Sequence, residues 1–276
     1  MNVWLSEEHT AGYAVHWRLR DIIHVEQTPY QELAIVDTHE WGRALILDSI
    51  VQTTEVDEFI YHEMIAHVPM MVHPNPVKVL IIGGGDGGTL REVLKYDSVD
   101  RVDLVEIDKQ VIEACRKYLP TISAGFSDDR ANIIIQDGLK YVKEAECKYD
   151  VVIIDSSDPV GPAVELFSAE FYRDIYELLH EDGIMTVQAE SPAFYGDVFA
   201  RVYHNMNTIF PRAGVYLACV PSYVSGFWAF GIASKQYHPE RAAAGRKPVT
   251  GLRYYTTDIH QAAFVLPPFV QKLLER

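Results

Sequence analysis

The chain has 276 residues, of which 48% are hydrophobic and 23% are charged, a composition typical of a globular protein with one large domain, or one large and one small. Its 24 lysines and arginines against 39 aspartates and glutamates give a formal net charge of −15 at pH 7. Such acidity argues against nucleic acid or an anionic membrane as a partner and fits a cationic one, although solubility alone explains it equally well.

The cysteines and the N-terminus exclude further classes. Cys115, Cys147 and Cys219 are scattered, with no C-x-x-C pair and no zinc-ligand spacing, so neither a disulfide framework nor a metal site is predicted. The first ten residues lack a basic flank followed by an apolar core, and no run approaches the length of a membrane span. We therefore expect a cytoplasmic protein.

Residues 1–55 are expected to form a small antiparallel β domain. Short runs of β-branched or apolar residues alternate there with turn-like residues. Strands are predicted at residues 22–26, 32–37, 43–47 and 50–53. Because such a meander is small for an independent unit, we expect it to pack on the next domain or to contribute to an oligomer.

Residues 56–276 are expected to form a Rossmann-like catalytic domain that begins with a helix at residues 56–71. An apolar run at 79–82, a loop with five glycines in six positions at 83–88, and a helix at 89–94 then make the first unit of a doubly wound α/β fold. Gly83, Gly85 and Gly88 satisfy G-x-G-x-x-G, in which glycines let the backbone turn tightly and approach a ligand.

The remaining elements alternate in the manner of a mostly parallel sheet with an antiparallel C-terminal hairpin. Strands are predicted at residues 101–108, 131–136, 149–155 and 183–188, helices at 109–118, 138–146, 168–180, 192–209 and 258–264, and the hairpin at 214–220 and 227–233.

Asp86 is the only residue with a side chain inside the glycine loop. A carboxylate there would repel a pyrophosphate at the helix N-terminus, so the loop favours a ligand without phosphate. The alternative is a turn that merely packs a helix on a sheet, but five glycines are more than packing requires.

Acidic residues end or follow each of the first four parallel strands. They are Asp86, Glu106, Asp137 and Asp155, with Asp158 close behind. Any one of them could be a helix cap or a solvated loop residue. Because the carboxyl ends of parallel strands meet at one edge of a sheet, four together predict a single binding crevice.

The positions of these acids indicate different roles. Glu106 lies where such folds hold ribose hydroxyls, and Asp137 can accept a hydrogen bond from an adenine amino group, which suits NAD and S-adenosyl compounds equally. Asp86, Asp155 and Asp158 would crowd like charges unless a cation binds or one carboxyl keeps a proton. This pocket therefore favours a sulfonium, an ammonium, or both.

Two neighbouring segments could complete the crevice. The segment from Asp155 to Pro162 contains residues that cannot continue a helix and is expected to form a loop that excludes water. Tyr61 and His62, on the helix before the sheet, could reach the same mouth, although a packed tyrosine and a surface histidine explain them nearly as well.

The motifs together resemble those of the spermidine synthase family of polyamine aminopropyltransferases, in order and along nearly the whole chain. They are Tyr30-Gln31, Gln52-Thr-Thr-Glu55, Asp57-Glu-Phe59, Gly83-Gly-Gly-Asp-Gly-Gly88, Glu106-Ile-Asp108, Gln136-Asp-Gly138, Asp155-Ser-Ser-Asp-Pro159 and His260-Gln-Ala-Ala-Phe-Val-Leu-Pro267. The resemblance implies a methyltransferase-like Rossmann domain after the β domain, and a homodimer or homotetramer. It also implies transfer of the aminopropyl group of decarboxylated S-adenosylmethionine to putrescine, giving spermidine and methylthioadenosine, with no prosthetic group and no metal.

The resemblance also implies residue roles. The nucleoside would be held by Gln31, Glu106, Asp137, Gly138 and Pro162, beside the backbone of Gly83 and Gly85. The amine site would comprise Tyr61, His62, Asp86, Asp155, Asp158 and Tyr223. Asp155 would accept the proton, assisted by the Tyr61 hydroxyl, and His62 stands where the family often has Gln.

Two rival classes remain: an S-adenosylmethionine-dependent methyltransferase, which would have to place the carboxylate of its cofactor near Asp86, and a non-catalytic polyamine-binding protein. The preference for putrescine over cadaverine or agmatine, and the choice between dimer and tetramer, stay open.

Overall fold

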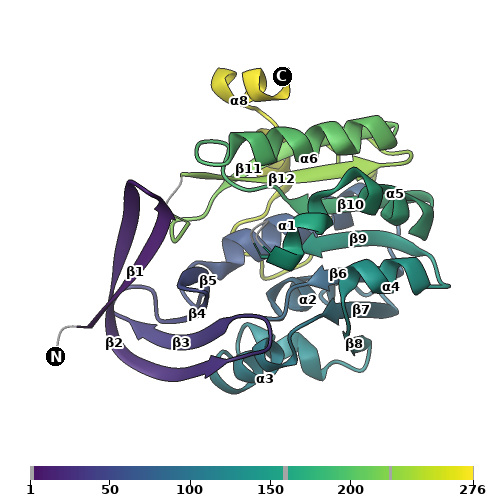
Figure 1. Ribbon diagram of the computed structural model, residues 1–276. Coiled ribbons are helices and arrows are strands. Elements are labelled where there is room, and N and C mark those ends of the chain that lie inside the picture. Colours follow the sequence, from purple (N-terminus) through teal and green to yellow (C-terminus); the bar gives the residue numbers. More distant parts are fainter. Residues whose placement is uncertain (1–2, 158–160, 224–225, 276) are drawn as a thin grey trace.

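The computed structural model describes residues 3–157, 161–223 and 226–275. Of residues 161 and 162 it describes the backbone but not the side chains. Asp158 lies outside the described residues, as does the side chain of Pro162. The described chain forms two sheets, and Figure 1 shows the N-terminal sheet in purple at one side of the larger one.

The N-terminal sheet is an antiparallel meander of five strands in chain order. They are β1 (Val3–Thr10), β2 (Tyr13–Gln27), β3 (Glu32–Thr38), β4 (Arg43–Leu47) and β5 (Ile50–Thr54). The last three match the sequence prediction closely, whereas β1 and the first half of β2 were missed. The one buried residue of β1 is the charged Glu7, so this strand lacks an apolar signal. In the first half of β2, Val15, Trp17 and Leu19 alternate with His16, Arg18 and Arg20, a strand pattern that the sequence prediction overlooked.

The C-terminal sheet has seven strands in the order β11-β12-β10-β9-β6-β7-β8. They are β6 (Lys78–Gly83), β7 (Arg101–Glu106), β8 (Ala131–Ile135), β9 (Tyr149–Asp155), β10 (Leu179–Gln188), β11 (Arg212–Cys219) and β12 (Phe227–Ser234). β6 to β10 pair in parallel, while β12 pairs antiparallel with both β10 and β11. The predicted fold class, a doubly wound α/β domain with an antiparallel C-terminal hairpin, is confirmed.

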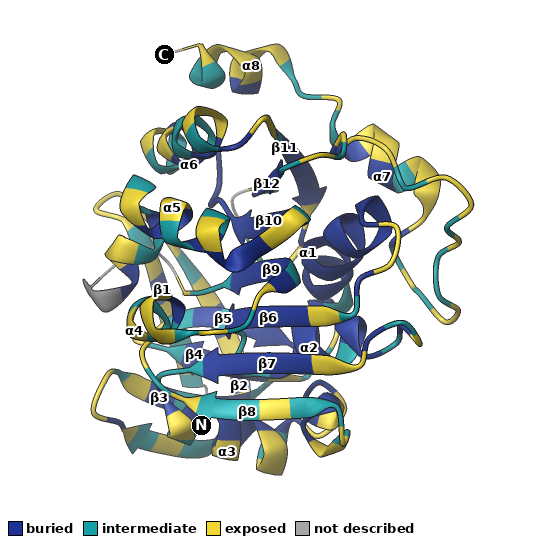
Figure 2. Ribbon diagram, turned by 90° about the vertical axis from the view of Figure 1, so that its right-hand side faces the viewer, coloured by how far each residue is buried: buried dark blue, intermediate teal, exposed yellow. Residues whose placement is uncertain are grey.

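Helices cover both faces of this sheet. They are α1 (Glu58–Val72), α2 (Gly88–Val93), α3 (Lys109–Tyr118), α4 (Gly138–Glu144), α5 (Ala169–Leu178), α6 (Gly196–Ile209), α7 (Thr257–Ala263) and α8 (Pro268–Leu274), with two 3₁₀ turns at Ser123–Ser127 and Gly161–Phe167. α1 and α2 pack on one face, and α4, α5 and α6 on the other. Figure 2 shows α1 and the central strands β6, β7 and β9 as almost wholly buried.

Several element boundaries differ from the sequence prediction, and one helix was missed. The helix expected at 168–180 ends at Leu178, because β10 begins at Leu179 and pairs there with Tyr149 before a register shift. The helix expected at 192–209 begins only at Gly196. α8, which was not predicted, begins at Pro268, where the fixed φ of proline suits the first helical turn.

The chain switches direction across the sheet between β6 and β9. The path runs from β6 outward to β8 and then returns to β9, which lies on the opposite side of β6. In open α/β sheets a ligand crevice forms at the carboxyl ends of the strands at such a switch point.

The N-terminal sheet is fixed over this end of the larger sheet. Asp108 caps α3 by accepting from the backbone of Gln110, and its other carboxylate oxygen accepts from Thr28 at 2.7 Å and Gln31 at 2.9 Å. Apolar residues of α3 also pack against β3 and β4. The N-terminal sheet therefore becomes one wall of the crevice.

Candidate active site

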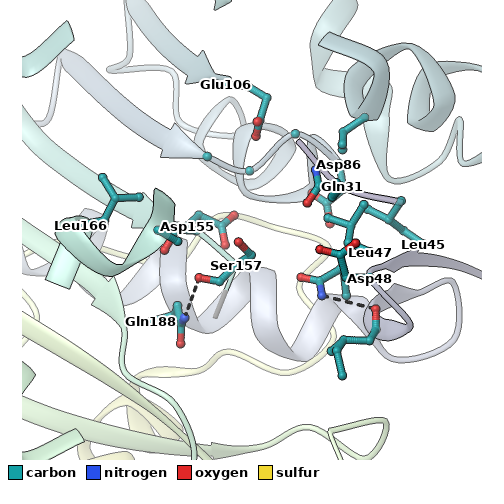
Figure 3. A pocket seen from close by; sticks show the side chains of 18 of the residues that line it. Gln31, Leu45, Leu47, Asp48, Asp86, Glu106, Asp155, Ser157, Leu166 and Gln188 are labelled. Atoms are coloured by element: carbon teal, nitrogen blue, oxygen red, sulfur yellow. Dashed lines mark hydrogen bonds between the residues drawn. The ribbon is translucent and has the colours of Figure 1, made fainter. Parts of the chain in front are cut away.

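A cavity of about 510 Å³ lies between the N-terminal sheet and the carboxyl ends of the parallel strands. Figure 3 shows Asp86, Glu106, Asp155, Gln31 and Asp48 around this common space. The cavity is lined by every predicted site residue whose side chain the structure describes: Gln31, Tyr61, His62, Gly83, Gly85, Asp86, Glu106, Asp137, Gly138, Asp155 and Tyr223.

The glycine loop brings the main chain against two of the acids. Gly83 has φ +81°, and a Cβ there would overlap the carbonyl oxygen of Asp155, which accepts from the backbone N–H of Gly84 at 2.7 Å. A Cβ at Gly85 would lie 2.9 Å from a carboxylate oxygen of Glu106. The loop is thus a close junction of β6, β7 and β9.

Asp155, at the end of β9, is held by two hydroxyls. Tyr61 on α1 donates to its Oδ1 and Thr89 on α2 donates to its Oδ2, both at 2.6 Å. Burial raises the pKa of Asp155, and the nearby carboxylate of Asp86 adds to this effect. Burial and the charge of Asp155 raise the pKa of Tyr61 well above its ordinary value, so the phenol keeps its proton. Asp155 is therefore a carboxylate of strengthened basicity beside a hydroxyl donor.

Asp86 faces a buried histidine. Its Oδ1 accepts from the backbone of Gly88 at 2.8 Å, and its Oδ2 lies 3.1 Å from Nε2 of His62. Burial alone would raise the pKa of Asp86, but the His62 charge and hydrogen bond lower it. His62 is only 2% exposed, so it is not a surface residue.

The other ring nitrogen of His62 meets a second acid that the sequence analysis did not single out. Nδ1 lies 2.6 Å from Oε2 of Glu58, one turn earlier on α1, and Arg91 on α2 donates to the same oxygen at 2.8 Å. Burial would lower the pKa of His62, but Asp86 and Glu58 raise it well above the ordinary value. Glu58 is buried and charged next to two cations.

Glu106, at the end of β7, lines the cavity. Its Oε1 accepts from the backbone of Asp108 at 2.8 Å, while burial raises its pKa to about 7. The Gln31 amide, which was expected at the nucleoside, donates to Asp108 and lines the cavity from that position. An ionised carboxyl in this position can accept hydrogen bonds from hydroxyl groups of a ligand.

Asp137 has two uses. Its Oδ1 caps α4 by accepting from the backbone of Leu139 at 2.9 Å, as one reading of the sequence anticipated, and its side chain also lines the cavity. Beside it, a Cβ on Gly138 would collide with Ile82, so the helix can start this close to β6 only with glycine. A cap leaves the second carboxylate oxygen available to a ligand.

Tyr223, which the resemblance placed at the amine, lines the cavity, and Gln188 and Trp228 are further cavity residues that the sequence analysis did not name. Tyr223 contacts the ring of Tyr61 edge-on, and its hydroxyl donates to the carbonyl of Gln52. Gln188 and Trp228 come from β10 and β12. Nothing in the residue types of Gln188 and Trp228 signals a site. Thr89 was not named either, although its position directly after the glycine loop could have suggested its hydrogen bond to Asp155.

Among the residues that the structure describes, one group of side chains could hold a metal ion: His73, Asp150 and Asp182. It lies at the opposite end of the sheet from the cavity, where β6 and β9 begin. Nδ1 of His73 accepts from the backbone of Asn75 at 3.2 Å, so the proton of the neutral ring is on Nε2, 3.5 Å from Asp182. A nitrogen that carries a proton has no lone pair for a metal.

The fold and the carboxylate-lined cavity place the chain among the Rossmann-like enzymes that act on nucleosides. Comparison with known families narrows this class. Residues 58–242 match the family model described as spermine/spermidine synthase domain, and residues 3–55 match the one described as spermidine synthase tetramerisation domain. The chain belongs to the spermine/spermidine synthase family and is an aminopropyltransferase, as the motifs predicted.

Individual relatives agree over their full length. A polyamine aminopropyltransferase of Moorella thermoacetica is 52% identical, covering 99% of this chain and 96% of the relative. One of Desulforudis audaxviator is 49% identical, covering 98% of each. A crystal structure of spermidine synthase in complex with the transition-state analogue AdoDATO has a TM-score of 0.96 and 44% identity, covering 99% of this chain and 95% of that one. Spermidine synthase from Thermotoga maritima has a TM-score of 0.93 and 43% identity, covering 99% and 94%.

Within the described residues, no helix combines the length and apolar character needed to span a membrane.

Proposed function

We propose that the chain is a spermidine synthase that transfers the aminopropyl group of decarboxylated S-adenosylmethionine to putrescine. The observation that carries the proposal is Asp155, whose basicity is raised by burial and which is bound to the Tyr61 hydroxyl, in the same cavity as Asp86 and Glu106. This arrangement joins a nucleoside end, a cation end and a proton acceptor. AdoDATO, bound by the relative of known structure, supports a substrate of this nucleoside class.

In the proposed reaction a neutral amine nitrogen of putrescine attacks the methylene carbon that is bonded to the sulfonium. The carbon–nitrogen bond forms as the carbon–sulfur bond breaks, and its electron pair passes to sulfur, which leaves as the neutral thioether methylthioadenosine. Because an alkylammonium has no lone pair, one proton must first move from the nitrogen to Asp155. The Tyr61 hydroxyl positions that carboxylate.

The two ends of the substrate pair would be held by different acids. Glu106 would accept from the ribose and Asp137 from the adenine amino group. Gly83, Gly85 and Gly138 would let the nucleoside approach the backbone closely, and Gln31 would line the cavity beside it. Asp86 would bind the ammonium of the aminopropyl arm. His62 and Tyr223 would border the amine. Asp158 and Pro162 keep their predicted roles, on the amine and on the nucleoside, as part of the proposal.

The test is turnover with putrescine and either decarboxylated or intact S-adenosylmethionine, with both amine products and methylated products quantified. A spermidine synthase forms spermidine and methylthioadenosine from the decarboxylated compound only. A methyltransferase forms methylated products from the intact compound, whose carboxylate would lie unfavourably near Asp86. Binding of both substrates without any product would identify a polyamine-binding protein.

We also propose that residues 1–55 are a separate domain through which the chain forms a homo-oligomer, and that this oligomer is a tetramer. The support is the match of residues 3–55 to a tetramerisation domain. Light scattering on the full chain, compared with the 31.3 kDa of one subunit, separates a tetramer from a dimer and both from a monomer.

A further inference from the structure

His62 is placed between two carboxylates. Its Nδ1 lies 2.6 Å from Glu58 and its Nε2 lies 3.1 Å from Asp86. An ionised carboxylate can only accept, and a neutral imidazole has only one N–H to donate. Both contacts are hydrogen bonds at once only when the ring carries two protons and one positive charge.

The groups around the ring favour this charged form. Arg91 donates to Glu58 and the backbone N–H of Gly88 donates to Asp86, so both carboxylates are stabilised as anions. Among the described residues, Asp155 adds negative charge nearby, the phenols of Tyr61 and Tyr223 are close to it, and the buried thiol of Cys115 lies within reach of the Asp86 charge. The ring also lies directly on Gly88, where any Cβ would overlap it, so the ring has little room to turn away.

The proposed function requires a second cation at the same place, and this inference rests on that function. The ammonium of the aminopropyl arm would bind at Asp86, whose Oδ2 already lies 3.1 Å from Nε2 of His62. The protonated His62 ring and the ammonium would then both donate to the carboxylate of Asp86, and in a buried pocket these two positive charges repel each other. A neutral ring removes the conflict: Nδ1–H stays on Glu58, and the Nε2 lone pair turns into an acceptor for the ammonium.

We propose that His62 gives up its Nε2 proton when the aminopropyl ammonium of decarboxylated S-adenosylmethionine binds at Asp86, so that substrate binding and proton release are one exchange. In the unliganded protein the proton occupies the cation position, which compensates the charge of Asp86. On binding, the ammonium replaces it. The affinity for decarboxylated S-adenosylmethionine therefore rises by about tenfold per pH unit as long as free His62 is protonated, and levels off above its pKa.

Calorimetry tests the exchange directly. The binding enthalpy is measured at one pH in buffers of different ionisation enthalpy, and its slope gives the number of protons released. Decarboxylated S-adenosylmethionine is compared with methylthioadenosine, which has the same nucleoside but no ammonium arm, so any contribution of Glu106 cancels. Wild type should release about one proton more with the decarboxylated compound than with methylthioadenosine, and His62→Gln should show no such difference.

Three results overturn the inference: no extra proton in wild type, the same extra proton in His62→Gln, or equal pH dependence of affinity in both proteins. The second result would assign the proton to Asp155 or to the substrate amine. If His62→Gln does not bind methylthioadenosine and is therefore misfolded, the nitrogen-15 spectrum of the wild-type histidines decides, since a ring that keeps both protons in the complex contradicts the exchange. Failure of the proposed function is distinct, because then no spermidine forms at any pH.

Discussion

Replacing Asp155 with Asn should lower turnover by about 100-fold or more while methylthioadenosine still binds. The two side chains have nearly the same shape, and the amide oxygen of Asn can still accept from one of the two hydroxyls, of Tyr61 and Thr89, that donate to the carboxylate. What the substitution removes is the negative charge and the ability to take a proton from the amine.

The size of the effect distinguishes a base from a binding residue. General-base catalysis contributes about 10²–10⁴ in rate, or roughly 2.7–5.4 kcal/mol. One hydrogen bond to a charged group contributes about 1.5–3 kcal/mol. Thr89→Val is the matched control, since it removes one hydrogen bond to Asp155 and leaves the carboxylate in place. By this range its loss of turnover should be about 10-fold to 160-fold, and in any case smaller than that of Asp155→Asn.

The pH profile separates the two variants further. Thr89 stabilises the ionised form of Asp155, so Thr89→Val should raise the pKa of this carboxyl further, and turnover should recover at higher pH. Asp155→Asn has no group to ionise and should stay slow at every pH. The assay is single-turnover formation of spermidine with both substrates saturating. Near-normal turnover in Asp155→Asn would refute the assignment of Asp155 as the base.

Three other predictions concern the remaining acids. Because burial raises the pKa of Glu106 to about 7, methylthioadenosine should bind more tightly as pH rises through this value, and calorimetry on Glu106→Gln should show no such pH dependence of affinity. The folded, unliganded protein holds the Glu106 proton more tightly than the unfolded chain, so its free energy of unfolding should fall as pH rises toward this pKa. Asp137→Ala should weaken methylthioadenosine by roughly 1–3 kcal/mol, and Asp137→Asn, which keeps the helix cap, should weaken it comparably; unchanged affinity in the Asn variant would leave Asp137 with the cap alone. Asp86→Asn should narrow the ratio of the dissociation constants of decarboxylated and intact S-adenosylmethionine, and an unchanged ratio would mean that selectivity has another source.

The fold class and the sheet edge at which the acids meet could be predicted from the sequence. Continuous apolar runs such as residues 79–82 identify strands buried on both faces, and parallel strands bring their carboxyl ends together. The register bears this out, since Gly83 at the end of β6 is directly opposite Asp155 at the end of β9. The family followed from motifs that lie along the whole chain. By contrast, β1 has too few buried residues to be visible as a strand.

The pairing of individual side chains could not be predicted from the sequence and is visible only in the folded chain. Tyr61 and Asp155 are 94 residues apart in the chain, and no local pattern specifies that α1 turns this hydroxyl toward the end of β9. Glu58 reads in the sequence as an ordinary acid at a helix start, yet burial makes it the second partner of His62. Packing removes these groups from water, and in that low-dielectric interior their mutual distances, which the linear sequence does not contain, determine which of them carry protons.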